Sequence, residues 1–380
     1  MPWKDKTVEN LRQEFIIAVQ SNQNFSAVCR EFNITRKTGY KWLERSQNNE
    51  SLSNKSRAPL TIANRTPKEI EELIVLLRIQ NPGWGAKKLK QVLENQNFVL
   101  PSAKTVNNIL NRYGCISKEE SLKHKPFVRF EKENCNDMWQ TDFKGEFRML
   151  DGNYCYPLNI FDDHSRYALV VHPVTSTANI VIPTFQEAFR RYGLPNSVLS
   201  DNGAQFAGFR QGFTQFEKWL MEHDILPIHG RIKHPQTQGK IERFHRTMKQ
   251  ELLKYRTPED IEDAIRLLGE WQVKYNTVRP HEALGLRCPS EVYQASSRVY
   301  DETPKEYIYS GQYHVIKVNT WGYVRFDRWQ VFLSETMAGE YIEFRPNPCR
   351  DSFNACFRNF VIAEFDSITG KLIHRKISRL

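Results

Sequence analysis

Residues 236–251 read Gln-Thr-Gln-Gly-Lys-Ile-Glu-Arg-Phe-His-Arg-Thr-Met-Lys-Gln-Glu, and the rest of the chain is arranged around them. Pro235 and Gly239 lead into a run with apolar residues at helical spacing, which predicts a helix from about Thr237. The opposite face carries one acid, Glu242, among several bases. Such a face is typical of a solvated surface helix, and it also fits a carboxylate that holds a metal ion beside a polyanion.

Length and charge indicate several domains and a polyanionic partner. The 380 residues suffice for roughly two to four domains of ordinary size. Lys and Arg number 54 against 44 Asp and Glu, which gives a formal net charge of +10. This balance favours DNA, RNA or an acidic membrane surface as the partner, without separating them.

The cysteine pattern and the apolar runs argue against a disulfide-rich, zinc-knuckle, secreted or membrane-spanning protein. The seven cysteines are scattered and form no Cys-x-x-Cys pair, so neither a disulfide framework nor a zinc knuckle is indicated. The first residues lack the apolar core of a signal peptide, and no apolar run reaches membrane-spanning length. We therefore expect a soluble protein of a reducing compartment, with no membrane partner.

Two helical units are predicted in the N-terminal part of the chain. Helices at 8–21, 26–32 and 36–45 have the layout of a helix-turn-helix, and the alternative is an ordinary three-helix bundle. The residues of the third helix expected to enter a major groove are Arg36, Lys37, Tyr40 and Lys41. After a basic linker at 47–60, helices from Thr66 to about 81, at 86–96 and at 102–113 predict a second helix-turn-helix. These units are assigned to 1–46 and 61–115.

The middle of the chain predicts an α/β core. After a second linker at 116–136, apolar alternation with period two indicates strands at 138–149, 154–161 and 167–174. Helices at 179–192 and 209–223 then alternate with strands at 197–200 and 226–230, and a later helix leads from Thr257 to about 276. The pattern predicts a mixed five-stranded sheet covered by helices over residues 137–296. Many short strands over 312–380 predict a small C-terminal β-barrel.

Three acidic residues lie at positions that favour a catalytic role. Asp142 lies in the first strand, Asp201 just past the fourth, and Glu242 near the start of the helix at 236–251, with 59 and 41 positions between them. Carboxylates are the preferred ligands of Mg²⁺ or Mn²⁺, and two such ions about 4 Å apart support in-line displacement at phosphorus. Taken singly, Asp201 also fits a simple turn. We assign Asp162 and Asp163 to a turn.

These residues resemble a known family. Residues 137–296 resemble the catalytic core of retroviral-integrase-like DDE transposases, and the whole layout is similar to insertion-sequence transposases of the IS481 type. The most specific motifs are Trp-Gln-Thr-Asp at 139–142, Leu-Ser-Asp-Asn-Gly-Ala-Gln-Phe at 199–206 and His-Pro-Gln-Thr-Gln-Gly-Lys-Ile-Glu-Arg-Phe-His-Arg-Thr at 234–247. The resemblance implies an RNase H-like fold and gives the catalytic and metal-binding roles to Asp142, Asp201 and Glu242, with two Mg²⁺ or Mn²⁺ ions.

The sequence departs from the family's pattern in two places. The interval between the second and third acids is longer than is common, through extra residues around 206–216. The N-terminal part of the sequence lacks the His/Cys zinc module of retroviral integrases, which favours the bacterial transposases of this family. We therefore expect a cytoplasmic bacterial protein that associates with the nucleoid when it is bound to DNA.

The resemblance implies a metal-dependent polynucleotidyl transferase. Residues 1–115 are expected to bind the terminal inverted repeats of a mobile element, and the core to cut the DNA and join the freed 3′-hydroxyl to target double-stranded DNA. A homo-oligomer, at least a dimer, is expected on DNA. Further DNA contacts are expected from Lys240, Arg243, His245, Arg246 and Lys249, with surface charge as the alternative.

Two residues near the end of the core, and the function itself, have alternative assignments. Arg279 and His281 are assigned either to the donor end of the DNA or to a structural turn, and Glu251 is expected to face solvent. Two other functions compete with transposition. One is a domesticated, non-catalytic DNA-binding regulator, and the other is an RNase H-type nuclease on RNA–DNA hybrids.

Overall fold

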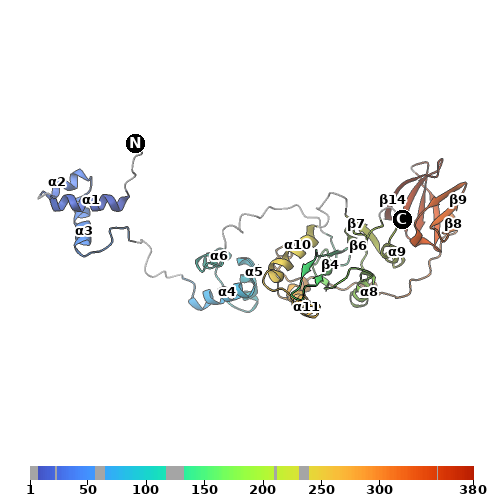
Figure 1. The fold of residues 1–380 in the computed structure, drawn as a ribbon, viewed down its shortest axis with the longest axis horizontal. Helices are drawn as coiled ribbons and strands as arrows, with labels where there is room; N and C mark the ends of the chain where they lie inside the picture. Colours follow the sequence, from blue (N-terminus) through green and yellow to red (C-terminus); the bar gives the residue numbers. More distant parts are fainter. Residues whose placement is uncertain are drawn as a thin grey trace. The chain divides into compact units, whose positions relative to one another are not determined.

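The computed structural model describes residues 7–21, 24–55, 65–116, 132–208, 212–230, 239–348 and 350–380. These form two compact units, Met1–Arg65 and Thr66–Leu380 (Figure 1). Among the described helices, none combines the length and apolar character that a membrane span requires.

The first unit contains the three predicted helices, α1 (Val8–Ser21), α2 (Phe25–Glu31) and α3 (Arg36–Gln47), drawn in blue in Figure 1. Thr35 caps α3 by accepting a hydrogen bond from the Thr38 amide at 3.2 Å. Gly39 allows a close approach of the helices, because a Cβ there would lie 2.8 Å from Cys29 Sγ. The apolar core is small, which is ordinary for a trihelical unit of this length. Its buried residues are Phe15, Ile16, Val28, Cys29 and Trp42.

The second unit begins with another trihelical arrangement, α4 (Lys68–Gln80), α5 (Ala86–Asn95) and α6 (Ala103–Arg112). Ile74, Trp84 and Leu89 are almost fully buried at its centre. Ser102 caps α6, whereas α4 starts after Pro67 without a side-chain cap, slightly later than the predicted start at Thr66.

The central sheet has the strand order β5-β4-β1-β6-β7, so the predicted mixed five-stranded sheet is confirmed. β1 pairs antiparallel with β4 and parallel with β6, and β7 extends the parallel side. The first two long strands that the sequence predicts are interrupted, because their ends form a separate two-stranded ribbon of β2 and β3. The bounds are β1 (Trp139–Phe143), β2 (Phe147–Arg148), β3 (Tyr154–Cys155), β4 (Leu158–Asp162), β5 (Ala168–His172), β6 (Ser197–Ser200) and β7 (Leu226–His229).

Helices cover the two faces of this sheet. Val170 of β5 packs against a core cluster with α8 (Val181–Tyr192) and α9 (Gln215–Glu222), whereas its neighbour Val171 belongs to one with α10 (Gly239–Met248) and α11 (Ile261–Thr277). Successive strand residues point to opposite faces, so the two pairs of helices lie on opposite sides. α9 starts later than predicted, at Gln215, and the predicted helical residues 209–211 lie outside the described residues.

The other helices of the core follow the predicted order. They are α10 (Gly239–Met248), which continues as a π-helical turn at Lys249–Leu253, then α11 (Ile261–Thr277) and short 3₁₀ helices at Glu282–Leu284 and Pro289–Glu291. The predicted start of the first of these near residue 237 lies outside the described residues, since the description resumes at Gly239.

The C-terminal residues form an open antiparallel sheet rather than the predicted closed barrel. Its order is β14-β13-β12-β11-β8, and β9 and β10 make a separate hairpin. In the described part of the chain the two edge strands, β14 and β8, are not paired with each other, so the closed barrel is not confirmed. Instead, the hairpin packs on the sheet, with Phe326 stacked on Phe344 at 4.3 Å. The bounds are β8 (His314–Lys317), β9 (Tyr323–Phe326), β10 (Trp329–Phe332), β11 (Tyr341–Pro346), β12 (Ser352–Phe357), β13 (Phe360–Asp366) and β14 (Leu372–Arg379).

Candidate active site

The parallel pairing of β1 and β6 brings two of the three predicted acids together. Gln140 pairs with Leu199 in this ladder, and the same register continued by two residues sets Asp142 beside Asp201. Both acids lie at the carboxyl ends of parallel strands, where open α/β sheets commonly have their sites.

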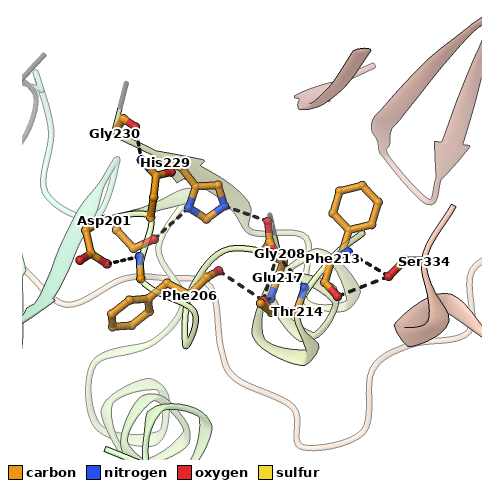
Figure 2. Close-up of polar contacts among 12 residues, drawn as sticks. Asp201, Phe206, Gly208, Phe213, Thr214, Glu217, His229, Gly230 and Ser334 are labelled. Carbon is orange, nitrogen blue, oxygen red and sulfur yellow. Dashed lines mark hydrogen bonds and ion pairs between the residues drawn. The ribbon is translucent and has the colours of Figure 1, made fainter. Parts of the chain in front are cut away.

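A tight turn fixes the backbone around Asp201. Its Oδ1 accepts a hydrogen bond from the Gly203 amide at 2.9 Å, and the Asn202 side chain donates to the Gly230 carbonyl at 2.9 Å (Figure 2). A Cβ at position 203 would lie 2.9 Å from the same Asp201 oxygen. A side chain at position 203 would therefore push the Asp201 carboxylate away from its present place.

The electrostatics connect Asp142 to both other acids. Burial and the negative charge of Asp201 raise the pKa of Asp142 to about 7, a hydrogen bond from the Phe143 amide opposes them, and the negative charge of Glu242 makes the smallest contribution to the rise. The charges of Asp201 and, more weakly, Glu242 therefore both act on Asp142. Within the described residues, however, no three His, Cys, Asp or Glu side chains converge as a group of metal ligands.

Two of the predicted DNA contacts of α10 lie against protein partners. Lys240 forms an ion pair with the buried Asp163 at 2.6 Å. His245 lies 3.0 Å from the Asn159 amide and 3.9 Å from an Asp142 oxygen, and burial lowers its pKa to about 3, so the ring is neutral. Both side chains are partly buried against these protein groups, and their contacts with DNA remain a prediction.

The remaining predicted DNA contacts are exposed. On α10 and the π-helical turn, Arg243, Arg246 and Lys249 lie at the surface. On α3 the exposed residues are Arg36, Lys37, Tyr40 and Lys41, and the Tyr40 ring stacks on Phe25 at 4.3 Å.

Asp162 and Asp163 have structural roles, as the turn assignment predicts. Asp162 accepts hydrogen bonds from the Asn136 amide at 2.7 Å and from the Ser165 amide and hydroxyl at 2.8 and 2.6 Å. Asp163 accepts from the Gln140 side chain at 2.6 Å. Both carboxylates are fully buried.

Arg279 and His281 also belong to a structural cluster. Arg279 Nε donates to both carboxylate oxygens of Glu251, at 2.9 and 3.0 Å, and another guanidinium nitrogen lies 3.2 Å from His281. Burial lowers the pKa of His281 well below its ordinary value. The prediction that Glu251 faces solvent is wrong, since only 11% of its side chain is exposed.

Asn159 was not predicted as a site residue, but it pairs with Asp142 across β1 and β4 and contacts His245. Glu217 and His229 were not predicted either, and they join the end of β7 to α9 beside the Asp201 turn. One local signal for Glu217 exists, because Thr214 and Glu217 have the spacing of a capping box. Nothing local marks the other two.

Three segments of the chain match known domain families. Residues 133–235 and 223–289 match the integrase core domain, and residues 38–110 match a homeodomain-like domain. Residues 133–289 form an integrase core domain. This confirms the resemblance to DDE transposases with such a core, whereas the IS481 type remains a prediction.

Relatives of the integrase core domain occur in mobile elements and viruses. The 39.2 kDa protein of insertion element IS476 from Xanthomonas euvesicatoria is 26% identical over 166 residues, which cover 43% of this chain and 45% of that protein. The Gag-Pol polyprotein of baboon endogenous virus is 29% identical over 192 residues, 49% of this chain and 11% of the polyprotein. The chain thus spans less than half of either relative.

A solved structure with partial likeness is the HTLV-2 integrase catalytic core domain in complex with magnesium, in its dimeric form. It is 17% identical, has a TM-score of 0.33, and the match covers 42% of this chain and 97% of the other. A score of this size adds no argument about function.

Proposed function

We propose that this protein is a transposase that cuts DNA at the ends of its mobile element and joins the freed 3′-hydroxyls to target DNA. The observation that supports the proposal best is the charge cluster in the integrase core domain. Asp142 lies beside Asp201 at the ends of adjacent parallel strands, and Glu242 is near enough for its charge to raise the pKa of Asp142.

The donor set fits hard divalent cations. The negative charges of Asp201 and, more weakly, Glu242 act on Asp142, and the neutral ring of His245 does not compensate them. Asp142, Asp201 and Glu242 would hold Mg²⁺ or Mn²⁺, since such ions prefer oxygen ligands and relieve repulsion between carboxylates. Two bound ions would activate the attacking oxygen and stabilise the leaving oxygen of the phosphodiester.

The chain's own residues position the acids. Asp142 is fixed in a central strand, with Asn159 and His245 packed beside it. The ion pair of Lys240 with Asp163 ties the first turn of α10 to the end of β4. Glu242 follows two residues later on α10, so this ion pair restricts where its carboxylate can lie.

DNA binding would use exposed bases on two elements. Arg243, Arg246 and Lys249 lie at the surface beyond Glu242 and suit contacts to phosphates. The exposed basic face of α3 suits a major groove, and we assign the terminal inverted repeats to residues 1–115.

Substitution of Asp201 by Asn tests the catalytic assignment. The change keeps the size of the side chain and removes its charge, so cleavage and strand transfer of a labelled terminal-repeat oligonucleotide in Mg²⁺ are expected to fall to background. Glu187→Gln is a matched control, because this glutamate of α8 is 78% exposed and is none of the three proposed catalytic acids. Full activity of the Asp201→Asn protein would falsify the assignment.

A non-catalytic DNA-binding regulator is the second candidate. It is favoured by one observation, that no three acids among the described residues converge as metal ligands. Metal-dependent nicking by the wild-type protein separates the two functions, since a regulator would bind the terminal repeat without cutting it.

A further inference from the structure

A chain of hydrogen bonds reaches the Asp201 turn from α9. Glu217 Oε1 lies 2.9 Å from His229 Nε2, and His229 Nδ1 lies 3.1 Å from the Ser200 hydroxyl (Figure 2). Glu217 and Ser200 are buried, whereas 23% of the His229 side chain is exposed. Ser200 is the last residue of β6, so this chain ends one residue before Asp201.

The other oxygen of Glu217 organises the segment before α9. Its Oε2 accepts hydrogen bonds from the Gly208 amide at 3.0 Å, the Thr214 amide at 2.7 Å and the Thr214 hydroxyl at 3.0 Å. Including His229, four groups converge on one buried carboxylate. An ionised carboxylate accepts hydrogen bonds and donates none, so the arrangement fits a charged Glu217.

This accepting role sets the direction of the chain of hydrogen bonds. Because Glu217 accepts, His229 donates from Nε2 and, in the neutral ring, accepts at Nδ1 from the Ser200 hydroxyl. The order resembles a Ser-His-acid triad. Ser200 is only 2% exposed, so it cannot reach a substrate as a nucleophile.

The same contacts hold the ends of β6 and β7 together. Ser200 and His229 are partners in the parallel ladder, the Gly230 amide donates to the Ser200 carbonyl at 3.1 Å, and Asn202 bonds the Gly230 carbonyl. The backbone on both sides of Asp201 is therefore tied to β7, and β7 is tied through His229 to Glu217.

The segment held by Glu217 also docks on the C-terminal sheet. The Phe213 amide donates to Ser334 Oγ at 2.9 Å (Figure 2). In addition, the Thr336 hydroxyl donates to the Phe213 carbonyl at 2.7 Å. The Phe213 ring is buried in the apolar cluster of the C-terminal sheet. This segment falls in the region where the sequence is longer than the common family pattern.

We propose that Glu217 and His229 are positioning residues for Asp201, acting through Ser200, and that the segment docked at Phe213 connects them to the C-terminal sheet. The inference rests on the proposed function, in which Asp201 binds metal. Glu217 orients His229, the ring orients the end of β6, and the Asp201 carboxylate is held where it can serve as a ligand.

Glu217→Gln distinguishes positioning from helix capping. Gln serves at this helix position as well as Glu, so the cap is retained. The side-chain NH₂ of Gln, however, donates a hydrogen bond to His229, where the Glu carboxylate accepted one. The His229 ring must then accept at Nε2 and donate from Nδ1. Loss of such a supporting partner typically lowers metal affinity or activity about 10- to 100-fold. We expect a fall of this size in kcat for strand transfer, with the KM for terminal-repeat DNA unchanged.

Two measurements are independent of turnover. Calorimetric titration with Mn²⁺ alone is expected to show weaker binding by the variant, and histidine-selective ¹⁵N spectra to show one imidazole changing tautomer. Glu222→Gln is the matched control, since Glu222 lies on the same helix but pairs with Lys218 at 3.4 Å. Thermal unfolding checks that both variants fold.

Ser200→Ala is the second variant, for the case that Glu217→Gln does not fold. It leaves the Glu217 and His229 pair in place and removes only the link to β6, and we expect a smaller fall in kcat and in Mn²⁺ affinity. If the wild-type protein is active and Glu217→Gln or Ser200→Ala matches it in kcat and Mn²⁺ affinity, the positioning role is overturned and the proposed function stands. If the wild-type protein neither binds Mn²⁺ nor cuts DNA, both are overturned.

Discussion

Two buried ion pairs fix the helical segment that carries Glu242. Near its start Lys240 pairs with Asp163, and beyond its end Glu251 pairs with Arg279. Only 11% of the Glu251 side chain and 10% of the Arg279 side chain are exposed. Removing one partner of such a pair leaves the charge of the other partner unpaired where little water can solvate it.

Glu251→Ala is therefore expected to destabilise the fold strongly. The free energy of unfolding should fall by about 3 kcal/mol, as is typical when one partner of a buried ion pair is removed. Denaturant unfolding of the full chain measures it. Glu270→Ala serves as the control, because its pair with Arg266 is exposed and is expected to contribute less than about 0.5 kcal/mol. Equal effects of the two substitutions would show that the Glu251 pair is solvated.

The orientation of Glu251 was accessible from the sequence. It follows Phe244 by seven residues and Met248 by three, which sets it on the buried side of a continuous helix. The partners of Lys240 and His245 were not accessible in this way. Asp163 and Asn159 lie 77 and 86 positions away from them, so only the tertiary structure brings them together.

At the scale of elements, strong local signals were read correctly. β6 was predicted at its observed bounds, Ser197–Ser200, because turn residues delimit an apolar run. The closed C-terminal barrel was not confirmed, since closure depends on whether the edge strands meet, and strand patterns do not encode that. The acids were found because their motifs are local, whereas Glu217 and His229 work through contacts between separate elements.

A partly buried histidine connects β5 to α8 and makes their packing sensitive to pH. His172 Nδ1 lies 3.0 Å from the Thr184 hydroxyl, which itself donates to the Ile180 carbonyl at 2.8 Å. The hydroxyl proton is thus used, so His172 donates from Nδ1. Burial lowers the pKa of His172 below its ordinary value of 6.5.

The unfolded chain therefore binds the His172 proton more readily than the folded chain. The contribution of His172 to the free energy of unfolding is expected to be fully present above about pH 6.5. It should decline as the pH falls below this value, because protonation then favours the unfolded state. His172→Gln should lose less stability than wild type between pH 7.5 and pH 5.5 in denaturant unfolding. An identical loss in both proteins would assign the pH dependence to other groups.

At the scale of the whole molecule, the C-terminal sheet is joined to the integrase core domain by several contacts around α9. Phe213 and Met221 lie in the apolar cluster of that sheet, and Arg358 donates to the Glu222 carbonyl at 2.9 Å. Arg379 pairs with Asp224 at 3.0 Å. The C-terminal sheet therefore covers residues of the core domain that would otherwise expose apolar surface to water.

Transposition as proposed requires two element ends in one complex, whereas a single chain offers one cluster of the three acids. One chain acting alone would have to process both ends in turn and keep the first from diffusing away. Two copies related by a two-fold axis would hold both ends at once, and closed two-fold symmetry is the commonest arrangement of homo-oligomers. We therefore expect light scattering to give at least two chains for each complex with paired terminal-repeat DNA. The Asp201→Asn protein should assemble equally well, because its change affects chemistry rather than DNA binding. A complex that remains at one chain on paired ends would contradict the proposed synapsis.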